Sequence, residues 1–266
     1  DLGSESVGVL WRSGNLGGAI SLGERILDYG RQRGIEKPLI RSVQRALSRV
    51  YCEIGEYEHA YELAKGSLRE SRLSNYRYGE MRALVCLASS NAALGNLEEA
   101  LTGFRRASDL CAQIGSKTDS LVIRLATASA LVWFGDTRHI LTTELLLREI
   151  VMDSRLLGSV PTEVLALSYL SRIFLSENRF EEALRASEAA LEIVEGANHK
   201  NFPPEPLVYF LHFLALHHAR DATAASHLRR ARDLLCQRAA TLPPRLRRSF
   251  LRRVPLHFAI SQMRGY

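Results

Sequence analysis

The chain has 266 residues, of which 46% are hydrophobic and 24% charged, and its formal net charge is +6. This composition is typical of a soluble globular protein with enough apolar residues to form a core. No run of about 18 apolar residues occurs, which excludes a membrane-spanning helix. Four of the 35 basic residues are lysines and the other 31 (35 − 4) are arginines, a bias typical of GC-rich bacterial genomes.

The first residues, Asp1-Leu2-Gly3-Ser4, contain neither a methionine nor the pattern of a signal peptide. We therefore expect the chain to be a piece of a longer protein. Four cysteines show no Cys-x-x-Cys spacing, which predicts small buried residues in a reducing cytoplasm, not disulfides or metal ligands. They are Cys52, Cys86, Cys111 and Cys236.

A six-residue pattern returns along the chain: a glycine or asparagine, a polar residue, an apolar or aromatic residue, two polar residues and an alanine. Its clear copies begin at Gly55, Gly95 and Asn178. Weaker copies begin at Gly14, Gly135 and Arg220, and the steps between copies are 41, 40, 40, 43 and 42 residues. A nearly constant step of this length indicates an internal structural repeat.

Helix-length segments flank each copy of the pattern. Before Gly55, apolar residues at helical spacing (Val43, Leu47 and Val50) define one face, and small or apolar residues continue from Ala60 after the turn. Small side chains allow two antiparallel helices to approach closely, and the glycine relieves the turn between them. Each repeat is therefore predicted to be a helix hairpin.

Residues that end helices predict the loops between repeats. These loops are expected near residues 34–38, 74–75, 115–117, 158–161 and 198–206. Leu242-Pro243-Pro244 should end the last repeat helix, and Arg245–Met263 should form a further helical stretch split at Val254-Pro255. We expect a repeat array over residues 1–240, with turns near 14, 55, 95, 135, 178 and 220. Residues 241–266 should form a capping segment, because a solenoid needs its terminal apolar face covered.

The turn pattern, the small helix residues Ser48, Ala88 and Ser171, and the aromatic Phe104 resemble the tetratricopeptide repeat (TPR) family. The usual TPR period is about 34 residues, so the longer units imply longer helices, as in large bacterial signalling proteins. The resemblance implies an all-α, right-handed α-α superhelix of about six hairpins with a C-terminal capping helix. The fourth unit carries Ile140 at the alanine position, which predicts altered packing there.

In the TPR family, inward-facing residues of the first helix of each hairpin line a concave groove that binds partners. Transferred by register, the predicted groove is basic near its N-terminal end and aromatic near its C-terminal end. An acidic peptide with a hydrophobic anchor would complement it. The alternative that the aromatic residues belong to the core stays open. The groove residues are Arg45, Arg49, Arg82, Trp133, Arg172, Phe210, Phe213 and His217.

A second candidate surface is an arginine-rich strip in the C-terminal quarter of the chain. Its acidic counterpart is Asp233 alone, and few aromatic residues interleave with it. It could be a solvated cap, a protein-docking surface or a contact for nucleic-acid phosphates. The strip includes Arg229, Arg230, Arg245, Arg248 and Arg252.

No catalytic or cofactor motif emerges. Gly115-Ser116-Lys117-Thr118 lacks the upstream glycine that a phosphate-binding loop requires, and His217 and His218 are adjacent, so they cannot readily share a metal. The pairs Glu98-Glu99 and Glu181-Glu182 lie where a helix is predicted to begin. Acidic side chains at that position interact favourably with the helix dipole. We expect no enzymatic activity, no metal and no cofactor.

The sequence thus predicts a cytoplasmic protein-binding module, a scaffold or sensor, within a larger bacterial signalling or transcription regulator. Its partner should be a protein or peptide, which could be another domain of the same chain, and not a membrane. A nucleic-acid-contacting repeat and a small-ligand sensor are the alternatives, and self-association stays open.

Overall fold

A computed structural model describes residues 2–33, 37–196 and 205–263, and within these ranges the chain is all helical, with no strand. The first half contains α1 (Leu2–Arg12), α2 (Leu16–Arg33), α3 (Lys37–Glu53), α4 (Tyr57–Leu73), α5 (Arg77–Ala93), α6 (Leu97–Ile114) and α7 (Lys117–Phe134). The second half contains a short 3-10 helix η1 (Thr137–His139), α8 (Ile140–Leu156), α9 (Val160–Ser176), α10 (Phe180–Gly196), α11 (Glu205–His218), α12 (Ala224–Ala240), α13 (Pro244–Arg252) and α14 (Pro255–Gln262).

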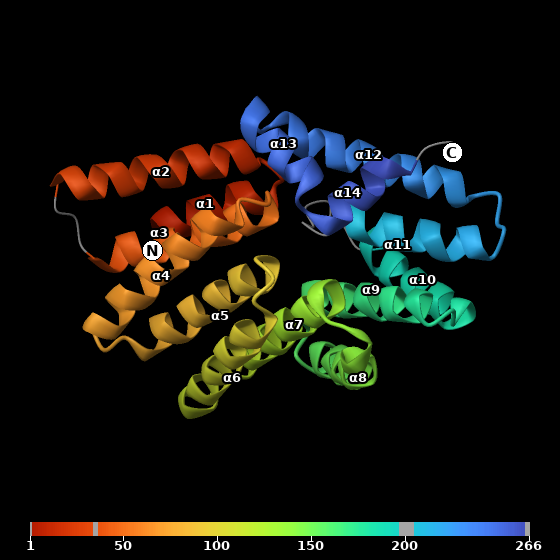
Figure 1. Cartoon of the computed structure of the whole chain (residues 1–266), viewed down its shortest axis with the longest axis horizontal. Coiled ribbons are helices and arrows are strands. Elements are labelled where there is room, and N and C mark those ends of the chain that lie inside the picture. The colour runs from red at the N-terminus through yellow and green to blue at the C-terminus, as the bar shows by residue number, and fades with distance from the viewer. Residues whose placement is uncertain (1, 34–36, 197–204, 264–266) are drawn as a thin grey trace. The chain divides into compact units, whose positions relative to one another are not determined.

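Six consecutive pairs, from α1 with α2 to α11 with α12, match the six predicted hairpins (Figure 1). Contacts divide the chain into two compact units. Unit 1 is Asp1–Ile123 with Arg238–Val254, and unit 2 is Arg124–Gln237 with Pro255–Tyr266. Within unit 1, α1 packs on α3 and α3 on α5, and within unit 2, α9 packs on α11. Within each unit, the first helices of these hairpins therefore lie side by side, as a stacked repeat requires.

Five of the six turns share one backbone geometry. The residue that ends the first helix has a positive φ: Gly14 (79°), Gly55 (81°), Gly95 (89°), Asn178 (58°) and Arg220 (56°). At Gly55 the amide of Gly55 donates to the carbonyl of Cys52 (3.2 Å), and that of Glu56 to Tyr51 (2.9 Å). The other four turns repeat the same pair of bonds. This is the Schellman motif, which satisfies carbonyls at the helix end and reverses the chain.

In four of these five hairpins the alanine of the pattern is buried against the first helix, whereas Ala225 of the sixth hairpin is half-buried. Ala60, Ala100 and Ala183 are fully buried. In two hairpins a serine of the first helix donates to the alanine carbonyl: Ser48 to Ala60 (2.8 Å) and Ser171 to Ala183 (2.9 Å). A larger side chain would separate the helices and break this buried bond, so the small residues set the helix spacing.

The fourth turn departs from the others, as Ile140 predicts. Gly135 does not adopt a positive φ, and its amide bonds to Leu131 within the helix. The extended Asp136 then accepts a bond from the amide of Arg138 (3.0 Å) and begins η1. Because η1 occupies the space of a first helical turn, α8 begins at Ile140, which is only partly buried.

Most predicted loops fall where the structure has them, but several of their last residues already belong to the next helix: Lys37 and Pro38 to α3, Lys117 to α7, and Glu205 and Pro206 to α11. Val160 and Pro161 belong to the first turn of α9 and not to the loop before it. Proline fits there because the first amides of a helix have no intrahelical partner. The predicted loops at 34–38 and 198–206 lie largely outside the described residues.

The C-terminal segment splits into α13 and α14 as the prolines predict. Within unit 1, the end of α13 packs against the second hairpin: the Tyr57 hydroxyl donates to the carbonyl of Arg253 (3.1 Å), and the Arg253 guanidinium bonds to Glu58 (2.7 Å). The amide of Gly17 also donates to the Thr241 hydroxyl (3.3 Å). Residues 238–254 therefore cover the turns of the first two hairpins.

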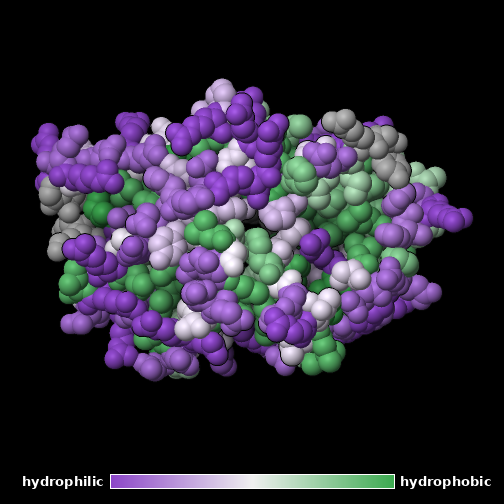
Figure 2. All heavy atoms as spheres, viewed as in Figure 1, coloured by the Kyte–Doolittle hydropathy of each residue, from purple (hydrophilic) through white to green (hydrophobic). Residues whose placement is uncertain are grey.

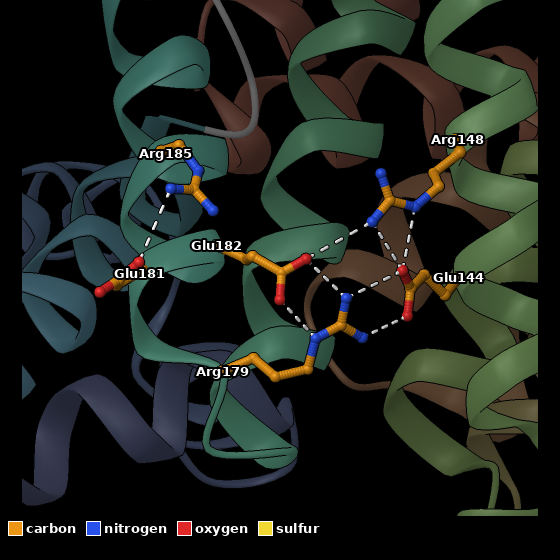
Figure 3. Close-up of polar contacts among 6 residues, drawn as sticks. All are labelled: Glu144, Arg148, Arg179, Glu181, Glu182 and Arg185. Carbon is orange, nitrogen blue, oxygen red and sulfur yellow. Dashed lines mark hydrogen bonds and ion pairs between the residues drawn. The ribbon is translucent and has the colours of Figure 1, made fainter.

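A network of ion pairs joins α8 to α10 where the repeat is irregular (Figure 3). Arg179 bonds to Glu144 at 2.6 and 3.2 Å and to Glu182 at 2.6 Å. Arg148 also bonds to Glu144, at 2.8 and 2.9 Å. The hydrogen bonds from Arg179 lead the effects that hold the pKa of Glu144 below its ordinary value of 4.5. This nearly buried carboxylate thus fixes α8 on α10.

Replacing Glu144 with Gln should lower the free energy of unfolding by about 1–2 kcal/mol at neutral pH, since two arginines lose a charged acceptor. A carboxylate whose pKa is lowered by folding stabilises the protein above the ordinary pKa and loses that effect as pH falls through the folded value. The difference between the two proteins should therefore shrink below about pH 4.5. Urea unfolding at neutral pH and near pH 3 measures it. Glu181→Gln is the control, because Glu181 is exposed and pairs with Arg185 at 3.8 Å.

Replacing Ala183 with Arg should lower the free energy of unfolding by at least about 3 kcal/mol, because a large charged side chain cannot fit between α9 and α10. Circular-dichroism melting measures the change. Glu188→Arg, at an exposed position of the same helix, should melt within a few degrees of the unaltered chain. Equal melting of the two variants would contradict the packing role of Ala183.

Candidate partner-binding site

Three arginines and a tryptophan surround a cavity of about 210 Å³ on the first helices of unit 1. Arg45 and Arg49 come from α3, Arg82 from α5, and Trp11 from α1. Arg45 and Arg49 share a helix face because they are four residues apart. We call this the arginine cavity. It brings together three of the four arginines of the predicted groove, and Cys86 also lines it.

Arg45 is a half-buried cation. The acidic residue that lines the same cavity is Glu5, which is exposed, and no carboxylate is among the groups that most shift the pKa of Arg45. Its Nη1 atom is buried and finds no hydrogen-bond partner. Burial is the largest effect lowering its pKa, and the neighbouring Arg82 and Arg41 lower it further. A buried guanidinium nitrogen without an acceptor is costly, and an oxygen ligand entering the cavity would remove that cost.

Arg49 lies over the ring of Trp11, with its guanidinium carbon 4.4 Å from the ring centroid. Arg49 retains solvent-exposed surface, but it lies in a concave site with protein atoms around it. This desolvation is the largest effect that lowers the pKa of Arg49. Stacking on an aromatic face stabilises a guanidinium while leaving its N–H groups free to bind. Arg49 is therefore held in place with donors to spare.

Trp11 is fixed by an acidic residue that also binds the C-terminal segment. Its indole N–H donates to Glu53, and Arg238 lies 3.2 Å from the other oxygen of that carboxylate. Burial raises the pKa of Glu53, and Arg238 is the largest opposing influence. Glu53, whose charge raises the pKa of Arg49, is thus already engaged by two other residues.

Arg82 is the paired member of the set. It bonds to Asp119 at 2.7 Å, and its guanidinium lies 6.0 Å from the ring centroid of Tyr78. Burial lowers the pKa of Arg82, but the bond to Asp119 and the nearby Tyr78 outweigh that effect, so the pKa is raised. Arg82 lines the arginine cavity as a structural cation.

In unit 2, Trp133 and Arg172 repeat the stack of Trp11 and Arg49. The guanidinium carbon of Arg172 lies 4.0 Å from the ring centroid of Trp133. Both arginines stand six residues before the turn of their repeat, at Gly55 and Asn178. The register of the repeat predicts Arg49, Arg172 and Trp133 as groove residues. The prediction does not include Trp11, which lies three residues before the turn at Gly14. Extending the register to the first unit would have found it.

Phe210 and Phe213 lie in the core and do not line a groove, with 3% and 0% of their surfaces exposed. The cause is α11 itself, which is apolar on nearly all sides and is buried from Leu207 to Phe213. Leu211 and Leu214, one residue further along, face a cavity instead. His217 is exposed and stacks on Phe213, with ring centroids 5.8 Å apart.

All five arginines of the predicted strip are exposed. Arg229 and Arg230 belong to α12 in unit 2, and Arg230 lies over Tyr209 (5.8 Å). The remaining three, Arg245, Arg248 and Arg252, belong to α13 in unit 1 and share one face of that helix. The predicted strip thus draws its arginines from both units.

Hydrophilic residues, in purple, cover much of the face seen in Figure 2, with hydrophobic residues in green between them. An exposed apolar stripe runs along one side of α8, formed by Leu141, Leu145, Met152 and Leu156. Their spacing places them on one helix face. No described helix has the length and apolar character needed to cross a bilayer, and the described residues hold no cluster of three metal-ligating side chains.

No protein-family model matches the sequence, and no curated protein does. Solved structures do resemble it. A Rap protein complexed with competence and sporulation factor aligns over 96% of this chain and 72% of its own, with a TM-score of 0.71 and 13% identity. The chain has a tetratricopeptide-repeat fold.

Two further TPR-fold structures resemble the chain. PlcR of Bacillus thuringiensis, in complex with the peptide PapR7 and DNA, aligns over 75% of this chain and 71% of its own, with a TM-score of 0.64 and 14% identity. A signal-transduction ATPase from Pyrococcus horikoshii with a TPR sensor aligns over 88% of this chain and 33% of its own, with a TM-score of 0.55 and 13% identity.

Proposed function

We propose that the arginine cavity binds an acidic segment of a peptide or partner protein. The observation that carries this is Arg45, a half-buried cation whose buried Nη1 has no hydrogen-bond partner among the described residues. Arg49, stacked on Trp11, adds a second oriented cation within the same cavity. Carboxylates are the protein groups that a guanidinium binds most strongly, often through two parallel bonds.

The TPR fold supports this role. The first helices of stacked hairpins present side chains from several repeats to one ligand, and the arginine cavity draws on three such helices. The Rap structure was solved with competence and sporulation factor, and the PlcR structure with the peptide PapR7 and DNA. By analogy we assign this chain to a non-catalytic sensor or scaffold module of a larger bacterial signalling or transcription regulator.

Peptides selected from a phage-displayed random library should be rich in Asp and Glu. Replacing Arg45 with Ala should weaken the best peptide at least about tenfold, because each charged hydrogen bond contributes about 1.5–3 kcal/mol. Fluorescence polarisation with the labelled peptide measures the affinity. Arg105→Ala is the control, since Arg105 is exposed on α6 and bonds to Thr102.

Two outcomes would contradict the proposal. The first is equal affinity of the Arg45→Ala and Arg105→Ala variants. The second is a steep fall of binding affinity with salt together with a preference for DNA or RNA. This result would indicate that the exposed arginines of α12 or α13 form the binding surface instead. Circular dichroism of each variant establishes that the helices are intact.

A further inference from the structure

A second cavity, of about 580 Å³, lies within unit 2 beside the irregular fourth turn. Its size falls within the range of about 300–1,000 Å³ typical of small-molecule sites. The walls come from the end of α7, from η1 and the start of α8, from the end of α9, and from α11. They are largely apolar. They include Leu131, Val132, Ile140, Ile173, Leu211 and Leu214.

The irregular turn explains why this cavity exists. In four of the other hairpins a buried alanine lets the second helix approach the first, whereas here η1 comes first and the bulkier Ile140 begins α8. Ile140 and Gly135 both line the cavity, as do Thr137 and His139 of η1. The departure from the repeat thus accompanies an open apolar space within the hairpin.

One cation lines this space. Arg172 is half-buried and stacks on Trp133, and its Nε donates to the carbonyl of Val132 (3.5 Å). Among the described residues no carboxylate pairs with it, and burial is the largest effect lowering its pKa. The acidic residue of the cavity, Asp136, is held by the side chain and amide of Arg138.

We propose that this cavity binds a small organic acid with an apolar body, the carboxylate on Arg172 and the apolar part against α7, α9 and α11. Apolar walls of this extent favour a hydrocarbon chain or ring. A guanidinium without an acidic partner favours a single anionic group at one end of the ligand. Trp133, held under Arg172, reports on occupancy.

Isothermal titration of the unaltered chain with decanoate and with decanol separates the two parts of the proposal. Decanoate should bind at least about tenfold more tightly than decanol, because the alcohol cannot pair with Arg172. Arg172→Gln should abolish this preference while leaving decanol binding unchanged, and Arg172→Lys should restore part of it. Leu214→Phe should weaken both ligands by filling the cavity.

The fluorescence of Trp133, measured in a Trp11→Phe chain, should change on addition of decanoate. Equal binding of decanoate and decanol, an unchanged preference in Arg172→Gln, or no binding of either ligand would overturn the proposal. The Arg45→Ala variant should bind decanoate with unchanged affinity, so the proposals for this cavity and for the arginine cavity are tested independently.

Discussion

The fold depends on one close contact, repeated along the chain: a buried alanine of the second helix against the first helix of its own hairpin. The contact is available because a positive-φ residue lets the chain reverse within a few residues, so that the alanine comes early in the returning helix. In the hairpins of Ala60 and Ala183 a serine hydroxyl bonds directly to the alanine carbonyl. A methyl-sized side chain is the largest that leaves this bond in place.

The fourth hairpin, in which Ile140 stands at the alanine position, is joined to the next hairpin by charges. Between α8 and α10, Glu144 accepts bonds from Arg148 and Arg179, and Arg179 also holds Glu182. Phe174 of α9 lies beneath both guanidinium groups, at 5.5 and 4.4 Å. A network of this kind specifies one arrangement of the helices through direction and charge, whereas the other hairpins do so through close packing.

Each unit also has an arginine stacked on a tryptophan of the preceding hairpin. Arg49 on Trp11 and Arg172 on Trp133 stand at the same position of their repeats, and each lines a cavity. The surroundings differ: a second cation, Arg45, lies beside Arg49, whereas apolar side chains surround Arg172. The repeat therefore supplies one recurring cation, and neighbouring residues decide which ligand chemistry it suits.

The sequence by itself determined the six hairpins, their turns, the break at Gly135–Ile140 and the split C-terminal helices, because these follow from local φ preferences, proline and helical periodicity. It also placed Arg45, Arg49 and Arg82 together, since register along stacked helices is periodic. Only the tertiary structure decided that Phe210 and Phe213 are core, because an apolar helix gives no sign of which side it buries. It alone paired Arg82 with Asp119, and among the described residues it left Nη1 of Arg45 without an acceptor and Arg172 without a carboxylate. It also placed α13 on the first hairpins, because such pairings join residues whose separation carries no periodic signal.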